Sequence, residues 1–274
     1  MFKNIFSLYS LVGFILLIIP MESICISENS RVYSYIREKV SIKIVYDNYR
    51  VNPDLISSWG FSCVIKTSSQ TILFDTGVNS SILLSNMRKM NIDPKKIDIV
   101  FISHIHADHL GGLLGFLEKN ENVTVYIPTS FPDEIKKQIK LHGAQYQNIG
   151  ESMQISDNIF TTGQMGTWIK EQSIILKTGD GLIVITGCAH PGIVNIINKV
   201  KKILPGEKIF LVMGGFHLSG VSELSLKNIV GKFKEAGIQK VAPSHCSGDR
   251  CRELFKANFK ENYINSGLGK IILF

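Results

Sequence analysis

The sequence predicts an α+β fold in which two β-sheets pack together with helices on the outside. Strand-like runs come first, over residues 40–77. Strand-like and helix-like segments then alternate in both halves of the chain, and no Pro/Ser-rich linker divides it. Because each of these elements must bury its apolar face in a shared core, we expect a single domain over residues 28–274.

The first half begins with three predicted strands and continues with alternating elements. "VSIKIVYD" alternates apolar and polar residues, whereas "NSSILLSNMRKMNI" starts with Asn and Ser and has apolar residues at three- and four-residue spacing. The first pattern is typical of a strand and the second of a helix. We therefore expect strands at 40–47, 61–69, 70–77, 97–104 and 123–128, and helices at 79–92, 110–120 and 131–143.

The second half repeats this style. "LIVITGCAH" is a continuous apolar run of strand length, and "GIVNIINKVKKILPG" has helical periodicity and ends at Pro-Gly. The same patterns recur to the end of the chain. We expect strands at 154–163, 171–181, 182–190, 208–216, 240–246 and 270–274, and helices at 192–206 and 222–238.

The first 27 residues differ from the rest. Lys3 precedes an apolar stretch over residues 5–20, and "CIS" stands before Glu28. This order is typical of a secretory signal peptide. An uncleaved anchor that attaches the protein to a membrane through residues 5–20 is the alternative, although the stretch is slightly short for a span. We expect an exported or membrane-anchored protein, or a cytoplasmic one if this segment is not a signal.

The net charge of +7 favours a small, anionic substrate over a nucleic acid. Lys and Arg are scattered, and no basic stripe with interleaved aromatic residues occurs in the sequence. The five cysteines include no C-x-x-C pair and are too few for a disulfide framework. Cys246 and Cys251 are close enough to bridge in an exported protein.

Chemically reactive side chains gather directly after predicted strands. Six of the seven histidines lie in such loops. Side chains at strand ends on one edge of a sheet can converge although they are far apart in the sequence. The loops in question carry Asp75, residues 104–109, Cys188 with His190, His217, and His245.

The segment "SHIHADH" predicts a metal site. His104 and His106 are two residues apart at the end of an extended segment, so their side chains can point the same way. Asp108 and His109 are adjacent, and a turn there can aim both inward. Imidazole nitrogen and carboxylate oxygen are ligand types that zinc prefers. A His-rich surface loop is the alternative, which the density of the cluster argues against.

These residues resemble a known family. "HIHADH" fits the H-x-H-x-D-H signature of the metallo-β-lactamase superfamily, and "LFDTG", "TGCAH" and "PSHCSG" are similar to its other motifs, in the correct order over residues 41–274. "WGFS", "TGCAHPGIVN" and "GGFHL" resemble the branch that contains dihydropteroate-synthase-like enzymes of methanopterin biosynthesis. The resemblance implies an αββα sandwich of two mixed β-sheets with helices on the outer faces.

The resemblance also implies two divalent metal ions, zinc first, with manganese and iron as alternatives. His104 and His106 would bind the first metal, with His190 as its third ligand. The second metal would be bound by Asp108, His109 and His245.

Other residues keep two interpretations. Asp75 either fixes a ligand histidine as a nearby carboxylate or forms an Asp-Thr-Gly turn. Cys188 stands where the superfamily usually has aspartate, and it either bridges the metals as a thiolate or packs behind the site. His217 either contacts substrate as an acid or is structural. Trp59 and Trp168 either line the pocket or pack in the core, and we expect core packing for both.

We expect a metal-dependent hydrolase. The resemblance implies that metal-bound hydroxide attacks an ester, thioester, lactone, amide or phosphoester, with Asp108 able to take up the proton. The alternative is a transferase that resembles 7,8-dihydropterin-6-methyl-4-(β-D-ribofuranosyl)aminobenzene-5'-phosphate synthase, in which the metals would serve a diphosphate leaving group.

Overall fold

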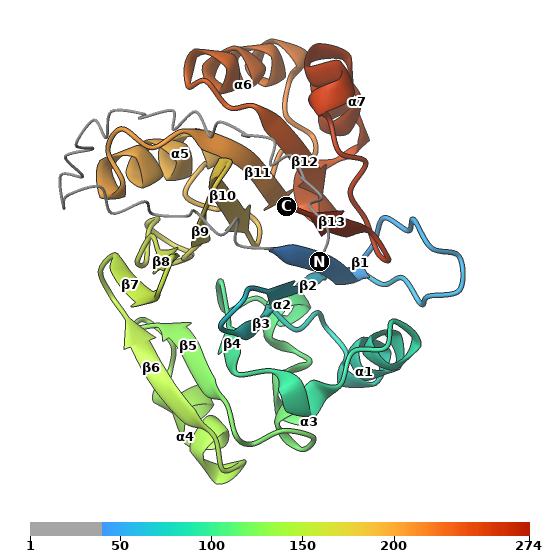
Figure 1. Cartoon of the computed structure of the whole chain (residues 1–274), viewed down its shortest axis with the longest axis vertical. Helices are drawn as coiled ribbons and strands as arrows, with labels where there is room; N and C mark the ends of the chain where they lie inside the picture. The colour runs from blue at the N-terminus through green and yellow to red at the C-terminus, as the bar shows by residue number, and fades with distance from the viewer. Residues whose placement is uncertain (1–39) are drawn as a thin grey trace, which may run out of the picture. The chain divides into compact units, whose positions relative to one another are not determined.

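Two mixed β-sheets form the centre of the computed structural model, which describes residues 40–274 (Figure 1). The first sheet has the strand order β13-β1-β2-β3-β4-β5-β6, and its strands from β3 to β6 are parallel. Its strands are β1 (Ser41–Asp47), β2 (Phe61–Lys66), β3 (Thr71–Phe74), β4 (Ile99–Phe101), β5 (Thr124–Pro128), β6 (Gln145–Ile149) and β13 (Ile271–Leu273).

The second sheet has the order β12-β11-β10-β9-β8-β7. β10, β11 and β12 are parallel to one another, and the remaining pairs are antiparallel. Its strands are β7 (Met153–Ser156), β8 (Ile159–Thr161), β9 (Ile174–Thr178), β10 (Gly181–Thr186), β11 (Ile209–Gly215) and β12 (Lys240–Ser244).

Helices cover the outer face of each sheet. α1 (Ser80–Lys89), α3 (Leu113–Leu117) and α4 (Asp133–Leu141) pack on the first sheet, whereas α5 (Ile193–Ile203), α6 (Glu223–Glu235) and α7 (Asp249–Phe259) pack on the second (Figure 1). The one-turn helix α2 (Ala107–Leu110) lies in the histidine segment. Short 3₁₀ helices span Pro94–Lys96, His245–Ser247 and Lys260–Asn262.

The core has three apolar layers: one between the two sheets and one between each sheet and its helices. Along β4, Ile99 and Phe101 enter the layer between the two sheets, whereas Val100, and Ile102 just after the strand, face the helices of the first sheet. Ile183 and Leu182 of β10 divide in the same way between the inner layer and the helices of the second sheet. Because successive strand residues point to opposite faces, a strand buried on both sides is a continuous apolar run.

The expected αββα sandwich is therefore confirmed, with differences in detail. Residues 154–163, expected as one strand, form the two antiparallel strands β7 and β8, because Asn158 takes a positive φ of 62° in the turn between them. β6 and α7 are additional elements that the pattern did not predict. β6 is largely exposed along its length, so it lacks the apolar pattern of a buried strand.

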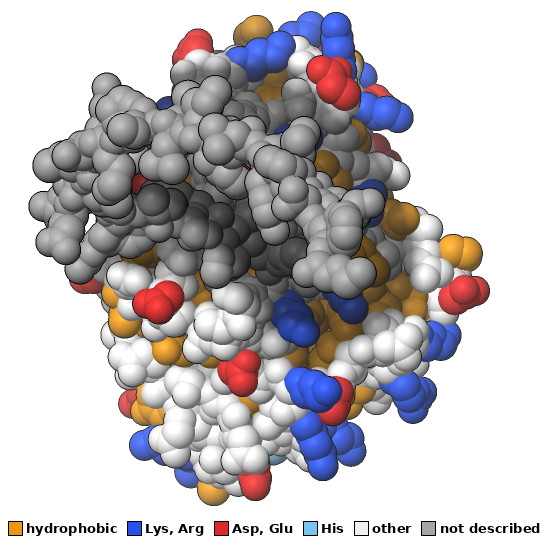
Figure 2. Space-filling view, in the orientation of Figure 1, with side chains coloured by type: hydrophobic (Ala, Val, Ile, Leu, Met, Phe, Trp, Pro, Cys, Tyr) orange, Lys and Arg blue, Asp and Glu red, His pale blue; other side chains and the backbone are white. Residues whose placement is uncertain are grey.

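The expectations for residues 1–27 lie outside the described residues. Within residues 40–274, no helix is both long and apolar enough to cross a membrane. Lys and Arg are dispersed among acidic and uncharged residues on the face seen in Figure 2. Cys246 and Cys251, which are close enough in the sequence to bridge, are both buried free thiols in the structure.

Parallel strands explain how distant residues meet. β3 and β4 are parallel neighbours in the first sheet, and β10, β11 and β12 are parallel neighbours in the second. Neighbouring parallel strands end at the same edge of their sheet. The loops after these five strands carry the reactive residues of the sequence, so each sheet presents its own set at one edge.

We predict that Phe101 is a principal anchor of the inner layer. Its buried ring stacks on Phe74 with centroids 5.5 Å apart. Phe101→Ala should lower the free energy of unfolding by about 3–5 kcal/mol, because it removes a buried ring and leaves a cavity. Urea denaturation measures this change. Leu273→Ala, at a side chain 73% exposed in β13, is the control and should change it by less than about 0.5 kcal/mol. Equal effects of the two substitutions would contradict the assignment.

Candidate metal centre

The histidine segment follows β4 and continues into α2. His106 is the N-cap of this one-turn helix, and Asp108 and His109 lie within it rather than in the turn expected from the sequence. The Gly pair that follows packs against the Asp75 turn: a Cβ on Gly111 or Gly112 would lie within 2.4 Å of the carbonyl oxygen of residue 78 or 76, respectively. Any larger residue would push α2 away from β3.

Three histidines form one donor group, here called the three-histidine group: His104, His106 and His190. His104 Nε2 lies 3.2 Å from His106 Nδ1, and the ring centroid of His190 is 4.8 Å from those of both other histidines. The structure thus brings together the residues that the sequence analysis assigned to the first metal. His190 reaches them from the loop after β10, across the interface between the sheets.

Four residues form a second donor group, here called the mixed group: Asp108, His109, Cys188 and His245. Asp108 Oδ2 lies 3.6 Å from His109 Nε2 and 3.2 Å from His245 Nε2. Cys188 Sγ lies 3.2 Å from His109 Nε2. These are the residues assigned to the second metal, together with the cysteine whose role the sequence left open. Cys188 also lies near His190 and His217, so it stands between the two groups.

Asp75 ties the histidine segment to β3. This buried carboxylate accepts the backbone N–H and the hydroxyl of Ser103, and it accepts Nδ1–H of His109, all at 2.7 Å. Burial alone would lower the pKa of His109, but the charge of Asp75 and this hydrogen bond outweigh it and raise the pKa. The geometry is that of a carboxylate that orients a ligand histidine. Asp75 also has a φ of 54°, so it forms the turn as well.

Neighbours on the Nδ1 side fix the tautomers of three histidines. Since the Ser103 hydroxyl donates to Asp75, His104 Nδ1 must donate to Ser103 Oγ, 2.8 Å away. His245 Nδ1 donates to the Asn48 side-chain oxygen at 2.8 Å. With His109 Nδ1 held by Asp75, the Nε2 atoms of all three rings face the donor groups, where a bound metal ion would take a lone pair from each. Neutral nitrogens of this kind are what a metal ion requires.

Two further observations fit a metal. His190 Nε2 is buried without a hydrogen-bond partner among the described residues, and His245 Nε2 faces the Asp108 carboxylate outside hydrogen-bond geometry. Buried polar atoms normally have partners, so these nitrogens point to a ligand. Burial and the neighbouring imidazoles lower the pKa of His104, and burial and His217 lower that of His190 to about 4. Both rings are therefore neutral at pH 7.

Glu171 is a site residue that the sequence analysis missed. Its buried carboxylate accepts the backbone N–H groups of Cys188, Ala189 and His190 at 2.8–3.0 Å. One carboxylate thus holds the whole turn that carries two donor residues. Because it acts on backbone atoms, no side-chain motif marks it. Its only signal is a charged residue three positions before the apolar strand β9.

Asp47 and Asn48 were also missed. Asp47 is buried at the end of β1 and accepts the Tyr49 N–H at 2.9 Å and the Ser244 hydroxyl. Asn48 holds His245 through its ring and its carbonyl oxygen. These two residues directly follow a strand core, as the other reactive residues do, so the same signal was present in the sequence.

His217 lies beside the three-histidine group. It follows β11, has a φ of 53°, and its ring centroid is 4.4 Å from that of His190. A hydrogen bond with Cys246 raises its pKa. Its position fits contact with a substrate, and its role stays a prediction.

The two tryptophans do not pack in the core, so that expectation was wrong. Trp59 is 56% exposed and contacts the ring of His245, and Trp168 is 95% exposed. Both lie in loops rather than on a buried face of a strand or helix.

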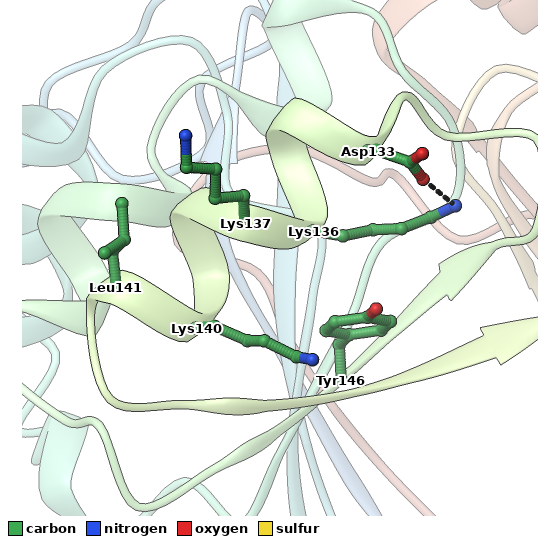
Figure 3. A pocket seen from close by; sticks show the side chains of 6 residues that line it. All are labelled: Asp133, Lys136, Lys137, Lys140, Leu141 and Tyr146. Atoms are coloured by element: carbon green, nitrogen blue, oxygen red, sulfur yellow. Dashed lines mark hydrogen bonds and ion pairs between the residues drawn. The ribbon is translucent and has the colours of Figure 1, made fainter.

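Of two surface hollows, one includes a candidate metal ligand and the other does not. One is lined by α5, the loop after β11 and α6, and it includes His190 and His217. The other lies on α4 and β6, where Lys136 pairs with Asp133 and Lys140 sits over the Tyr146 ring (Figure 3). The second hollow contains no candidate metal ligand, so the first is the candidate substrate site.

We predict that Glu171 holds the donor turn in place. Glu171→Ala leaves three backbone N–H groups without their acceptor and should lower the free energy of unfolding by at least about 3 kcal/mol. Glu171→Gln keeps one oxygen and should cost less. Urea denaturation of the metal-free protein measures both. Glu235→Ala, at an exposed site on α6, is the matched control. A loss as small as that of the control would contradict this role.

Asp47 predicts a dependence of stability on pH. Burial raises its pKa from 3.8 to about 6. The folded state therefore favours the protonated form, so the contribution is fully present below about pH 3.8 and is lost as pH rises through about 6. Relative to Asp47→Asn, the metal-free wild type should lose on the order of 3 kcal/mol of unfolding free energy across this window. Denaturation at a series of pH values measures the difference, and parallel curves for the two proteins would refute it.

Comparisons with known proteins agree with this geometry. A model of the metallo-beta-lactamase superfamily matches residues 60–198, just over half of the chain. The chain is 28% identical to the 7,8-dihydropterin-6-methyl-4-(β-D-ribofuranosyl)-aminobenzene-5'-phosphate synthase of Methanocaldococcus jannaschii, over 86% of this chain and 97% of the synthase. It is 26% identical to ribonuclease Z of Pediococcus pentosaceus over 54% of this chain and 49% of that enzyme.

A solved structure is similar over nearly its full length. It is described as a metal-dependent hydrolase of the beta-lactamase superfamily, shares 28% of its residues with this chain, and superposes with a TM-score of 0.70 over 85% of this chain and 98% of its own. The named relatives are enzymes. This chain is homologous to the archaeal synthase and belongs to the metallo-β-lactamase superfamily.

Proposed function

We propose that this protein is a metal-dependent hydrolase that holds two divalent ions, one in the three-histidine group and one in the mixed group. The observation that carries the proposal is the convergence of both groups, with buried Nε2 atoms that lack hydrogen-bond partners. Imidazole, carboxylate and thiol donors together suit zinc, with iron or manganese as alternatives. When bound, such ions lower the pKa of a water molecule and stabilise negative charge on a substrate oxygen.

We assign Asp108 to metal binding more than to proton transfer. Burial acts to raise the pKa of this carboxyl, but the contacts with His245 and His109 outweigh it and hold the pKa well below its usual range. An ionised, weakly basic carboxylate is a good ligand and a poor acceptor of protons at neutral pH. His217 is the better candidate for donating a proton to a leaving group, since it lies at the edge of the site and carries a raised pKa.

Cys188 belongs among the proposed ligands rather than behind the site. Its buried sulfur faces the ring of His109 and lies between the two donor groups. Asp108 is the only carboxylate in these groups, so a thiolate supplies a second negative charge opposite two divalent ions. Without a metal, the hydrogen bond with Cys246 and burial keep the pKa of the Cys188 thiol raised. A coordinated thiol is deprotonated outright.

The substrate proposed for this site is a small anionic ester or phosphoester. The hollow beside the donors places Lys232 and Asn195 in the same wall as His190 and His217. A cation and an amide can hold an anionic group while its reacting bond faces the metal groups. The net charge of +7 adds a general attraction for anions.

A transferase is the second candidate, and one observation favours it. The homologous synthase aligns over 97% of its own length, so its whole fold is represented here. The name of that enzyme describes a product with a pterin and a 5'-phosphate. The same two donor groups would then face a phosphorylated leaving group rather than a water-cleaved ester.

Purified protein tests the choice directly. Chromogenic phosphodiesters, esters and lactones should be hydrolysed, and a chelator should abolish turnover that added zinc restores. Activity only with a pterin diphosphate and an aminobenzene ribosyl phosphate would select the transferase instead.

Metal content tests the proposal without reference to substrate. The wild type should contain about two metal equivalents, and the double variant H104A/H106A should retain less than one, because the three-histidine group is lost. Its activity should fall at least about a hundredfold. Elemental mass spectrometry measures the metal. His142→Ala is the control, since this histidine caps α4 and bonds to Gln138 outside both groups. A wild type without metal would refute the proposal.

A further inference from the structure

Trp59 occupies an unusual position for a tryptophan. Its ring contacts the ring of His245 with centroids 4.9 Å apart and planes tilted by 56°, yet 56% of the residue is exposed. His245 belongs to the mixed group. One side of the indole therefore packs on a donor residue, while a large apolar surface next to the metal centre stays open.

The loop that carries Trp59 is fixed to the body of the protein. Leu55 is buried in this loop, and both backbone polar groups of Ile56 bond to the buried side chain of Asn86 at 2.9 Å. On the other side of the tryptophan, a Cβ on Gly60 would lie 2.5 Å from the backbone oxygen of Asp108. The loop is therefore tied down both before and after Trp59, so the exposed indole is held in one place.

A fixed, exposed indole beside a donor residue is available for stacking. Its loop is anchored by Leu55, Ile56 and Gly60, whereas the indole itself stays largely in solvent. Tryptophan offers a large π-face that binds planar rings with little loss of side-chain freedom. Because Trp59 contacts His245 of the mixed group, a ring stacked on Trp59 would lie close to the part of the substrate that reacts at the proposed metal site.

We infer that Trp59 is a specificity-determining residue that stacks on a planar, π-rich ring of the substrate, such as a heterocycle. This inference rests on the proposed function for the place of the reacting group, and it names the class of substrate. The anionic part of such a substrate would lie toward the hollow of His190 and Lys232, and its planar part on Trp59. The other exposed tryptophan, Trp168, contacts no donor residue in the rings described and provides a control.

Binding of two matched acids tests the inference. Pterin-6-carboxylate is planar and aromatic, whereas cyclohexanecarboxylate carries the same charge on a non-planar ring. Calorimetry with the metal-loaded protein should give a Kd for the pterin acid that rises at least about tenfold in Trp59→Leu, as expected for the loss of one stacked ring. Trp59→Phe should recover most of the affinity, and Trp168→Leu should not change it.

In Trp168→Leu, where Trp59 is the remaining tryptophan, the pterin acid should quench the tryptophan fluorescence.

The outcomes separate this inference from the proposed function. An unchanged Kd in Trp59→Leu, or a wild type that binds both acids equally or neither, overturns the role of Trp59. A change confined to oligomeric state in Trp59→Leu overturns it as well. Metal content measured on the same samples tests the proposed function independently: two equivalents of metal with an unchanged Kd leave the hydrolase standing, and absence of metal refutes the hydrolase whatever the Kd.

Discussion

The hydrogen bonds to the Asp75 carboxylate are the interactions on which the site depends most. They join the end of β3 to the end of β4 and set the orientation of His109 in α2. The hydroxyl of Ser103 passes the constraint on to His104. One buried carboxylate thereby fixes a histidine of each donor group. The backbone strain of a positive φ at this residue is supported by the three donors around it.

Two other buried carboxylates also hold segments that carry candidate ligands. Glu171 holds the turn of Cys188 and His190, and Asp47 holds the residue before His245. Burying several carboxylates in one region is costly because each loses its hydration, and burial raises the pKa of Glu171 to about 7. Hydrogen bonds offset part of this cost. Divalent ions among the donors would offset more, so the buried acids and the proposed metals stabilise each other.

The sequence predicted the site best where side chains themselves carry the chemistry. The histidine segment, His190 and His245 all follow apolar strands, and the fold of parallel strands brings them to shared edges. Glu171 was missed because it binds backbone atoms, which leaves no pattern of side chains. Trp59 was misjudged for a different reason: an aromatic residue predicts burial from its apolar surface alone, whereas its exposure here depends on a loop fixed by Asn86 and Gly60. The exposed strand β6 was missed because a strand is predicted from the apolar residues it buries, and β6 has few of them.

The proposed metal-binding groups and their supports do not by themselves distinguish one substrate from another. In this enzyme superfamily, the relatives named here include a synthase and a ribonuclease, so related sequences serve different reactions. Selectivity must then come from residues that border the centre without belonging to it. In this chain the candidates are His217 and Lys232 in the hollow, and Trp59 beside His245 of the mixed group. A cationic wall and a fixed aromatic face together favour a substrate that is anionic at one end and planar at the other. The loop that carries Trp59 is held in place by Asn86 and by the close packing of Gly60, so stacking of a ring on Trp59 would cost little conformational entropy. His217, Lys232 and Trp59 could therefore select a substrate without rearrangement of the proposed metal ligands.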